Sequence, residues 1–587
     1  MFEFRITNLI NQKKMKKLNN LNKVIAMALS FVATASVAQS NLGAECGCPP
    51  VASRPEVIVS SMPGYTAISG TYGGDMTTGA AFTCQNTYIL DKKIYIPSGQ
   101  VLTIEPGTVI KGAPNAVAAE ATALVISRGG RIIANGTESC PIVFTAQADP
   151  MDGTYAISNV GKWGGIAING KATNNLTLAA NGPFVVGAAN GKLAFADGLG
   201  TLEGFQTTNV QDQFGVNLTA GETFNDNDNS GIFRYVSIRH AGAILTVGGE
   251  MNGLTLGSVG RGTTIEHVEI VSNADDNIEV FGGTVNLKYC STIFGNDDMF
   301  DFDLGWTGKA QFLFGMKSDA TSSPDNDNGF EIDADDQKSN VLPRTHPVVY
   351  NATIIGNGKT TQTVDNSSLS AINAKELTEG EIYNSVFANF KSGLNLVKSL
   401  SGTRSFAAGG ESWHNWTNIA GPASATNGNG SQSLKIKCNT FVGITNPLTQ
   451  GSLGATLIAS GTTDYTQFNT TDMNELVSGN TLPGFSYAFT LNTTTNAYTV
   501  KPDVIPNPAL SVSGCPTAPV DGFFTAAPYR GAFSSNPGQN WLSDWSYSQV
   551  LGHIQGITAC PTDLDTDGDT DVDDFLIFAP AFGTTCN

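Results

Sequence analysis

Basic residues are scarce in this 587-residue chain, which has 32 Lys and Arg against 51 Asp and Glu and a formal net charge of −19. Phosphate backbones and anionic membranes are poor partners for so acidic a protein, and this excludes nucleic-acid binding. Beyond its N-terminal region the chain also lacks an apolar run long enough for a membrane-spanning helix. We therefore expect no transmembrane segment, and cations and neutral sugars as the better-suited partners.

Several sequence motifs that are typical of enzymes are absent as well. The five histidines show no zinc-ligand spacing, and no Gly-x-Ser-x-Gly occurs. Gly358-Lys359-Thr360 resembles the end of a phosphate-binding loop, but Thr353 stands where the first glycine of that loop should be. These absences leave no motif for a zinc enzyme, a nucleophile elbow or a nucleotide site.

The first 38 residues predict an export signal. Basic residues between Lys13 and Lys23 precede an apolar run, Val24–Ala38, which ends in the small-residue cleavage site Ser36-Val37-Ala38. All nine cysteines follow this site, as expected for an oxidising compartment where disulfides persist. The expected pairs are Cys560–Cys586, Cys84–Cys140 and Cys438–Cys515, and because nine is odd, at least one thiol is free or pairs elsewhere.

Short apolar segments separated by Gly and Asn turns run through the chain, which contains 65 Gly and little helical periodicity. An acidic motif repeats among them: residues 275–281 return as residues 297–303, and Gly329–Asp333 matches the second copy at an offset of 30. Periods in the twenties with one strand pattern per repeat are typical of stacked coils. The sequence therefore predicts an all-β chain folded as a right-handed parallel β-helix, with insertions near residues 113–122, 172–225, 357–375 and 399–430.

Several runs resemble secreted β-helix proteins that are common in Bacteroidota. Ile94–Gly112 is similar to their first coils, and further similar runs are Gly161–Gly170, Asn225–Gly231, Phe281–Asn286 and Tyr529–Phe533. The resemblance covers roughly residues 46–555. It implies the β-helix fold and a secreted or cell-surface location, and it implies little about function, because such proteins mostly lack an assigned activity.

Stacked coils would bring the acids of the repeat together, since residues 275–336 contain 14 acidic and 3 basic residues. Alternation along a strand turns the aromatic side chains of the motif to one face and its carboxylates to the other. This predicts a ladder of carboxylates, in which those of successive coils lie about 5 Å apart. Glu279, Asp301 and Glu331 form one column, and Asp303 and Asp333 form the next. Three interpretations stay open: a cation site, an acid/base pair for glycoside cleavage, or a solvated outer face.

Catalysis would require more than the ladder. Polygalacturonase-like enzymes carry Gly-His-Gly and Arg-Ile-Lys motifs, which this sequence lacks, and pectate-lyase-like enzymes need a basic proton acceptor beside calcium. The basic residues near the ladder belong to no recognised motif; they are Lys288, Lys309, Lys317 and Arg344.

The C-terminal segment predicts a second cation site. Seven carboxylates occur within residues 563–574, Gly568 stands where a calcium loop turns sharply, and Phe575–Phe578 starts a short apolar helix. The pattern resembles one type I dockerin repeat, an EF-hand-type loop. Its expected Ca²⁺ ligands are Asp563, Asp565, Asp567, Asp569, Asp571 and Asp574.

Together these observations predict a division of the chain and a role. We expect a signal peptide (1–38), an N-terminal linker and cap (39–85), a parallel β-helix (86–500), a C-terminal cap or extension (501–555) and a dockerin-like calcium module (556–587). The predicted function is that of a secreted or cell-surface calcium-binding β-helix protein with a structural or adhesive role, whose partners are calcium and an extracellular polysaccharide or cell-surface component. A β-helix polysaccharide lyase or glycoside hydrolase that uses the acidic ladder is the alternative.

The C-terminal loop is directly testable. Substituting both Asp563→Ala and Asp567→Ala should abolish calcium binding by a peptide of residues 556–587, because two of its oxygen ligands are lost. Calorimetry on the oxidised wild-type peptide should give a Kd of about 10⁻⁴–10⁻³ M, typical of extracellular modules. Absence of calcium heat from the wild-type peptide would contradict the prediction.

Overall fold

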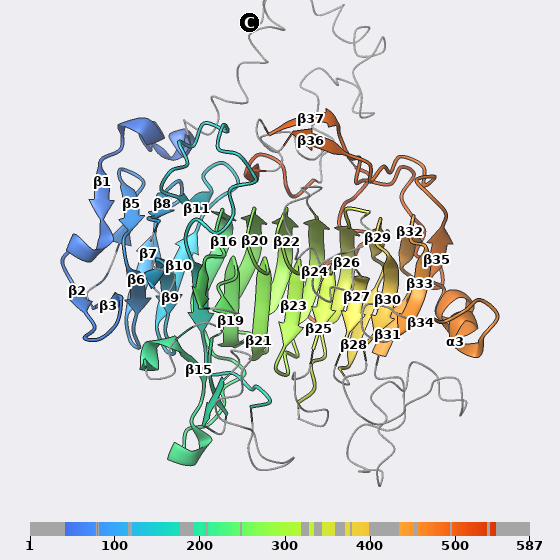
Figure 1. Ribbon diagram of the computed structural model, residues 1–587, viewed down its shortest axis with the longest axis horizontal. Helices are drawn as coiled ribbons and strands as arrows, with labels where there is room; N and C mark the ends of the chain where they lie inside the picture. The colour runs from blue at the N-terminus through green and yellow to red at the C-terminus, as the bar shows by residue number, and fades with distance from the viewer. Residues whose placement is uncertain are drawn as a thin grey trace, which may run out of the picture.

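The computed structural model describes residues 42–547, except 78, 80, 115–119, 177–192, 197, 203–204, 206–208, 247–248, 318–327, 334–342, 359–369, 376–377, 398–433, 451–455, 493–495 and 537–539. Strands stack from the N-terminal coils at one end to α3 at the other (Figure 1). Two long sheets with parallel neighbours form the stack, which confirms the β-helix. Among the described residues no helix is long and apolar enough to cross a membrane.

Sheet B contains 13 strands, and its neighbours are parallel except at the two ends, where β2 pairs with β3 and β33 with β34. Its members are β2 (Tyr65–Ala67), β3 (Gly73–Met76), β6 (Lys93–Ile96), β9 (Ala123–Ile126), β12 (Gly165–Asn169), β19 (Leu254–Val259), β21 (Ile278–Gly283), β23 (Phe300–Asp303), β25 (Phe330–Ile332), β27 (Ser370–Ala374), β30 (Ser392–Leu396), β33 (Asn446–Gln450) and β34 (Thr456–Leu457).

Sheet A contains 17 strands. They are β1 (Glu56–Ile58), β4 (Ala81–Phe82), β5 (Thr87–Leu90), β7 (Val101–Ile104), β8 (Val109–Gly112), β10 (Arg131–Asn135), β11 (Ile142–Ala146), β16 (Gly231–Arg239), β20 (Thr264–Val271), β22 (Asn286–Ile293), β24 (Lys309–Met316), β26 (Val348–Ile355), β28 (Gly380–Tyr383), β29 (Val386–Ala388), β31 (Leu434–Lys437), β32 (Thr440–Val442) and β35 (Glu475–Val477).

The long strands of sheet A bend at one residue per coil. Tyr235, His267, Tyr289 and Phe312 occupy equivalent positions in β16 to β24, and each has a φ between 48° and 58°. Left-handed backbone costs an ordinary residue roughly 1–2 kcal/mol. Stacked rings offset part of this cost, because successive ring centroids in this column lie 4.3, 4.5 and 4.9 Å apart.

Between the sheets lies a continuous apolar core, to which nearly every coil contributes inward-facing side chains. Phe300, Phe302 and Phe330 are fully buried there, and their rings contact one another between 5.6 and 6.3 Å. These three aromatic residues of the acidic repeat therefore face the core, and its carboxylates face the outer side of sheet B.

A small antiparallel sheet from the predicted 172–225 insertion covers part of the outer side of sheet B. It comprises β13 (Leu193–Ala196), β14 (Leu199–Thr201) and β15 (Gln213–Gly215). Phe214 of β15 stacks on Phe281 at 5.8 Å and lies over Gly257, where an added Cβ would come within 2.7 Å of the Phe214 side chain. The missing side chain at Gly257 thus lets the insertion close on the coils.

The remaining elements are short. They are η1 (Ala44–Cys46), η2 (Val51–Ser53), η3 (Val59–Ser61), η5 (Val210–Asp212), η6 (Leu218–Ala220), β17 (Ile244–Thr246), β18 (Gly249–Glu250), α3 (Thr463–Thr466), η9 (Gln467–Thr471), β36 (Thr490–Asn492) and β37 (Ala497–Val500).

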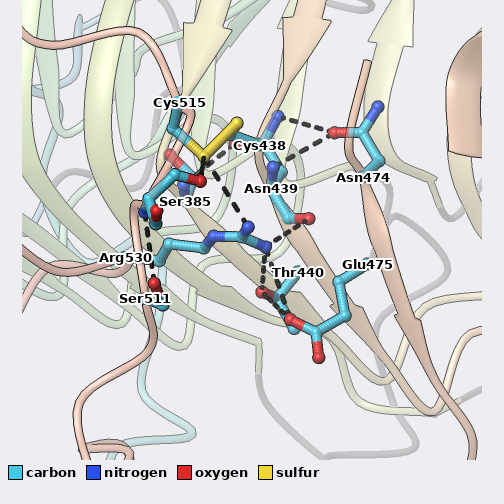
Figure 2. A network of polar contacts seen from close by, with 10 residues as sticks. Ser385, Cys438, Asn439, Thr440, Asn474, Glu475, Ser511, Cys515 and Arg530 are labelled. Carbon is cyan, nitrogen blue, oxygen red and sulfur yellow. Dashed lines mark hydrogen bonds and ion pairs between the residues drawn. A yellow bond between two sulfur atoms is a disulfide. The ribbon is translucent and has the colours of Figure 1, made fainter. Parts of the chain in front are cut away.

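The described residues of 501–547, here called the C-terminal strap, return along the outer side of sheet A. Trp545, Phe533 and Leu542 pack in one apolar cluster with side chains from β20 to β32. Figure 2 shows how Arg530 of the strap donates from Nη1 to the carbonyl of Asn439 (3.3 Å) and to Thr440 Oγ1 (3.1 Å), and approaches Glu475 Oε2 at 3.4 Å. The Cys438–Cys515 disulfide lies beside this arginine and links the strap covalently to the same coil.

Disulfide pairing corrects part of the sequence prediction. Cys438–Cys515 is confirmed, whereas Cys84–Cys140 is wrong: Cys84 bonds to Cys48, and Cys140 bonds to Cys46. Both corrected bonds attach the 46–48 segment to the first coils. Sequence spacing missed them because this segment folds back across the end of the stack, where the backbone of Gly107 approaches Cys48.

Arg530 should be important for strap docking. Replacing Arg530 with Ala removes charged hydrogen bonds from a side chain that is 10% exposed, so we expect a loss of about 2–3 kcal/mol in the free energy of unfolding. Denaturant titration measures this loss. Arg530→Lys, which keeps the charge but lacks the planar guanidinium group, should show an intermediate loss. Lys501→Ala serves as the control at an exposed residue. Identical midpoints for wild type and Arg530→Ala would rule out this role.

Candidate functional site

The turns that enter sheet B carry an acidic pair in two successive coils. Asp275-Asp276 precedes β21 and Asp297-Asp298 precedes β23. Each second member accepts a backbone N–H from the next coil: Asp298 N donates to Asp276 Oδ1 at 2.8 Å, and Asn328 N donates to Asp298 Oδ1 at 2.6 Å. These side chains therefore tie consecutive turns together.

The predicted first column of the ladder is present. Glu279 pairs in register with Asp301, and Asp301 pairs with Glu331. Their exposed fractions are 1%, 5% and 8%. The interpretation as a solvated outer face is therefore wrong, because charges with so little exposure need hydrogen bonds, protons or cations instead of water.

The second predicted column is also buried but less regular. Asp303 is fully buried, is in register with Phe281, and accepts the N–H of Leu304 at 2.5 Å. Asp333 follows the last residue of β25, is 1% exposed, and donates its own N–H to the carbonyl of Phe302 at 2.9 Å. The two acids lie at the ends of strands, where the ladder pairing stops.

Two overlapping groups of carboxylates have the spacing of a cation site. The inner group is Asp276, Glu279 and Asp301, and the outer group is Asp275, Asp276 and Asp297; within each group the ligand oxygens all lie within 4.8 Å of one another. Oxygens bound to one Ca²⁺ at 2.3–2.6 Å are at most about 5 Å apart, so both groups fit this ion. Sequence reasoning missed three of these ligands, Asp275, Asp276 and Asp297, although the Asp-Asp pair was the signal that revealed the repeat.

Asp276 belongs to both groups and has a perturbed pKa. Burial, together with the negative charges of Asp297, Asp275, Asp298 and Asp301, raises the pKa of Asp276 well above its usual value. A cation between these carboxylates would reverse that shift, because it favours the charged form.

Glu331, at the far end of the ladder, is balanced by protein groups. Lys375 forms an ion pair with Glu331 Oε1 and lies 4.0 Å from Asp333 Oδ2. The amides of Asn328 and Asn373 donate to Glu331 Oε2 at 3.0 and 3.3 Å. The part of the ladder that has the spacing of a cation site therefore lies in the coils of β21 and β23.

Beyond Glu331 the same column continues with neutral side chains. Asn373, Asn395 and Thr449 are in register and almost fully buried. Thr449 Oγ1 donates to Asn395 Oδ1 at 2.8 Å, and Asn395 Nδ2 donates to Asn373 Oδ1 at 3.0 Å. The chain of donors thus points toward the acidic end of the column.

A buried amide also closes the opposite end. Asn252, which is 2% exposed, donates from Nδ2 to Glu279 Oε2, while its Oδ1 has no hydrogen-bond partner among the described residues. The amide oxygen of a side chain that contacts Glu279 is a ligand type that Ca²⁺ accepts.

Comparison with known families agrees with this architecture. A family model described as a pectate-lyase-like β-helix domain matches residues 74–452, which is more than half of the chain. The chain belongs to this family. No curated protein and no solved structure matches the chain.

Membership in a pectate-lyase-like family directs attention to the basic residues near the ladder. Lys288 and Lys309 lie on sheet A, where Lys288 donates to the carbonyl of Phe523 at 2.6 Å and Lys309 pairs with Asp521 at 2.5 Å. Lys317 donates to the carbonyl of Asp297, and Arg344 pairs with Glu379 at 3.1 Å. All four are engaged in contacts of their own, and of these only the contact of Lys317 is with a residue of the two carboxylate groups.

The other predicted sites lie outside the described residues. These are the export signal, the expected Cys560–Cys586 pair and the C-terminal loop ligands Asp563, Asp565, Asp567, Asp569, Asp571 and Asp574.

A second charged cluster of this β-helix surrounds His346. Its Nδ1 lies 3.0 Å from Glu379 Oε2, and its Nε2 lies 3.6 Å from Glu381 Oε1. Burial alone would lower the pKa of His346, but the hydrogen bonds with the two glutamates raise it to about 9. Glu381 is also held by Lys435 at 2.7 Å. The cluster is an ion network that links β28 and β31 with the residues before β26.

The His346 network should make stability depend on pH. Because the folded pKa lies above the unfolded value of about 6.5, the contribution of His346 is fully present below pH 6.5 and is lost as pH rises through about 9. We expect wild type to lose more thermal stability than His346→Asn between pH 6.5 and 9.5. Parallel melting curves over this range check the difference, and equal slopes for the two proteins would contradict it.

Proposed function

We propose that this β-helix protein is exported and binds calcium at the inner carboxylates, and that it has a structural or adhesive role at the cell surface. The observation that carries the proposal is the inner group itself. Asp276, Glu279 and Asp301 are each at least nine-tenths buried and bring their oxygens within 4.8 Å of one another. Like charges at this range either hold protons or recruit a cation.

Calcium suits the inner group better than a smaller ion. Mg²⁺ binds at 2.0–2.1 Å in strict octahedral geometry and keeps its waters, whereas Ca²⁺ accepts six to eight oxygens in a flexible shell. Buried carboxylates supply such oxygens, and the Asn252 side chain, whose Nδ2 contacts Glu279, carries a further oxygen. A bound ion would join β21 to β23 and thereby stabilise the middle of the stack.

An extracellular location accounts for the disulfide bonds. Three disulfides join the ends of the stack to neighbouring segments, and disulfides of this kind persist in oxidising compartments. The predicted export signal and the C-terminal dockerin-like loop belong to the same proposal. An anionic, calcium-dependent surface is compatible with attachment to extracellular polysaccharide or to a cell-surface component.

A polysaccharide lyase or glycoside hydrolase is the second candidate, and the family description is the observation that favours it. Fold membership does not carry chemistry with it, because function depends on the groups at the site. Lys288, Lys309 and Arg344 are engaged with other groups, Lys317 donates to the backbone carbonyl of Asp297, and Lys375 is paired with Glu331. The structural role is therefore the better supported of the two.

Calcium should stabilise the β-helix through Asp301. In a full-length protein whose C-terminal loop is silenced by Asp563→Ala and Asp567→Ala, we expect calcium at 100 times Kd to add about 2.7 kcal/mol to the free energy of unfolding, relative to EDTA. Asp301→Asn should lose most of this gain, whereas Glu45→Gln, at an exposed residue of the N-terminal segment, should keep it. Differential scanning calorimetry with and without calcium provides the measurement.

Two results would overturn the proposal. One is an unfolding transition that calcium leaves unchanged in the loop-silenced protein. The other is release of reducing ends or unsaturated products from a polysaccharide, if Asp301→Asn abolishes this turnover without changing the melting temperature; the enzyme candidate would then be correct.

A further inference from the structure

The C-terminal strap is fixed covalently at Cys515 and by non-covalent contacts beyond it, and we infer that residues 516–547 form a mechanical release. A pull on the C-terminal side peels these residues from sheet A, and the Cys438–Cys515 disulfide stops the peeling before a coil is lost. This inference rests on the proposed surface role, because a protein that attaches a cell carries load, but it uses none of the calcium ligands.

Two disulfides define the covalent path that a force takes through the chain. At the N-terminal end the force enters at Cys46 and crosses directly to Cys140, so the residues between these two cysteines lie outside the path. At the C-terminal end the force crosses from Cys515 to Cys438 in the same way. The terminal coils of the stack are therefore protected from peeling, whereas the strap beyond Cys515 is not.

This part of the strap is attached to sheet A through separate hydrogen bonds. Among the described residues of 516–547 no strand forms, so no ladder joins them to the coils. Instead, side chains of sheet A contact the backbone of the strap. Lys288 Nζ donates to the carbonyl of Phe523 at 2.6 Å, and Asn351 Nδ2 donates to the carbonyl of Tyr529 at 2.8 Å. Separate bonds of this kind break one at a time when one end of the segment is pulled.

The middle coils are held in a different way. Strand β20, for example, pairs in register with β16 on one side and with β22 on the other, and its inward side chains belong to the apolar core. Removing such a strand would break two ladders and expose core side chains together. Segments with fewer buried contacts open first, so we expect the strap to yield before these coils.

The last described residues of the strap hold its end in place. Tyr547 N donates to Glu269 Oε2 at 2.8 Å, and the Arg239 guanidinium lies 4.3 Å from the centre of the Tyr547 ring. The ring of Trp545 meets that of Tyr235 edge-on, with their centroids 5.6 Å apart. Trp545 and Tyr547 are each 2% exposed. A pull from the C-terminal side must break these contacts first, so they set the force at which the release begins.

The position of the disulfide limits how far the strap can extend. Because an extended chain spans at most about 3.3–3.6 Å per residue, residues 516–547 release at most about 110 Å of chain. Without the disulfide, the segment between Cys438 and Cys515, whose sequence separation is 77, would also enter the path of the force. That segment would add up to about 260 Å.

Single-molecule force spectroscopy on the full-length protein tests the release. The protein is held by its N-terminus and by an azide-bearing amino acid in place of Ser548, so that the force enters next to Tyr547. The oxidised protein, in EDTA, should yield first in an event of at most about 110 Å. It should regain this length on relaxation, because the coils stay folded and present the same contacts to the strap.

Variants of the same protein assign the parts of the release. Trp545→Ala together with Tyr547→Ala should lower the force of the first event. Val520→Ser, at a fully exposed residue of the strap, is the matched control that should leave this force unchanged. Cys438→Ser together with Cys515→Ser should add a second event of up to about 260 Å before the middle coils yield, and the oxidised parent should lack this event.

A first event longer than about 110 Å in the oxidised protein overturns the release, because coils would then yield before the strap. An unchanged force in the Trp545 and Tyr547 double variant overturns the role of the strap end. If the cysteine variant fails to fold, the length of the first event in the oxidised parent still decides the question. Since EDTA removes calcium throughout, failure of the release leaves the proposed calcium site standing, and failure of that site leaves the release standing.

Discussion

Register between parallel coils is the constraint on which the rest of this molecule depends. In a parallel stack, each position of one coil lies about 4.8 Å from the same position of the next, so a side chain meets its own equivalents along the axis. Apolar residues at inward positions build the core in this way. The column Tyr235, His267, Tyr289 and Phe312 uses the same repeat to stack rings where the backbone is left-handed. Carboxylates in a column are brought equally close, and for them proximity is unfavourable.

The two sheets handle their outer sides differently. Sheet A presents an apolar strip that includes Val271, Ile293 and Met316, and the C-terminal strap buries this strip. The strap brings aromatic anchors such as Trp545, and its attachment is made secure by Arg530 and the Cys438–Cys515 disulfide. Sheet B presents apolar residues under the insertion and polar residues farther along the stack. The acidic groups begin where the Phe214–Phe281 contact ends.

Sequence reasoning recovered what depends on periodicity. The 22-residue and 30-residue offsets placed Glu279, Asp301 and Glu331 in one column, and the structure confirms that register. Features that depend on contacts between distant segments could not be predicted from the sequence. Burial of the ladder could not be read from local alternation, because alternation separates core from outer face without showing that other segments cover the outer face. The Cys46–Cys140 and Cys48–Cys84 bonds escaped for the same reason, since they depend on how the N-terminal segment crosses the first coils. Asp275, Asp276 and Asp297 were visible as a repeat, but only the fold of the turns brings them together.

Comparison of the two halves of the sheet B column gives the physical reason for expecting an ion there. An amide side chain has both donors and an acceptor, so Asn373 and Asn395, with Thr449, satisfy one another along the stack. An ionised carboxylate only accepts, and a row of carboxylates at the same spacing cannot form such a chain. Glu331 accepts the hydrogen bond at the end of this amide chain and forms an ion pair with Lys375. One and two coils away, Asp301 and Glu279 join Asp276 in a group where burial and the neighbouring negative charges raise the pKa of Asp276. Asparagine would fit the same register at less electrostatic cost, so the use of acids at these positions is explained if a cation belongs to the folded structure.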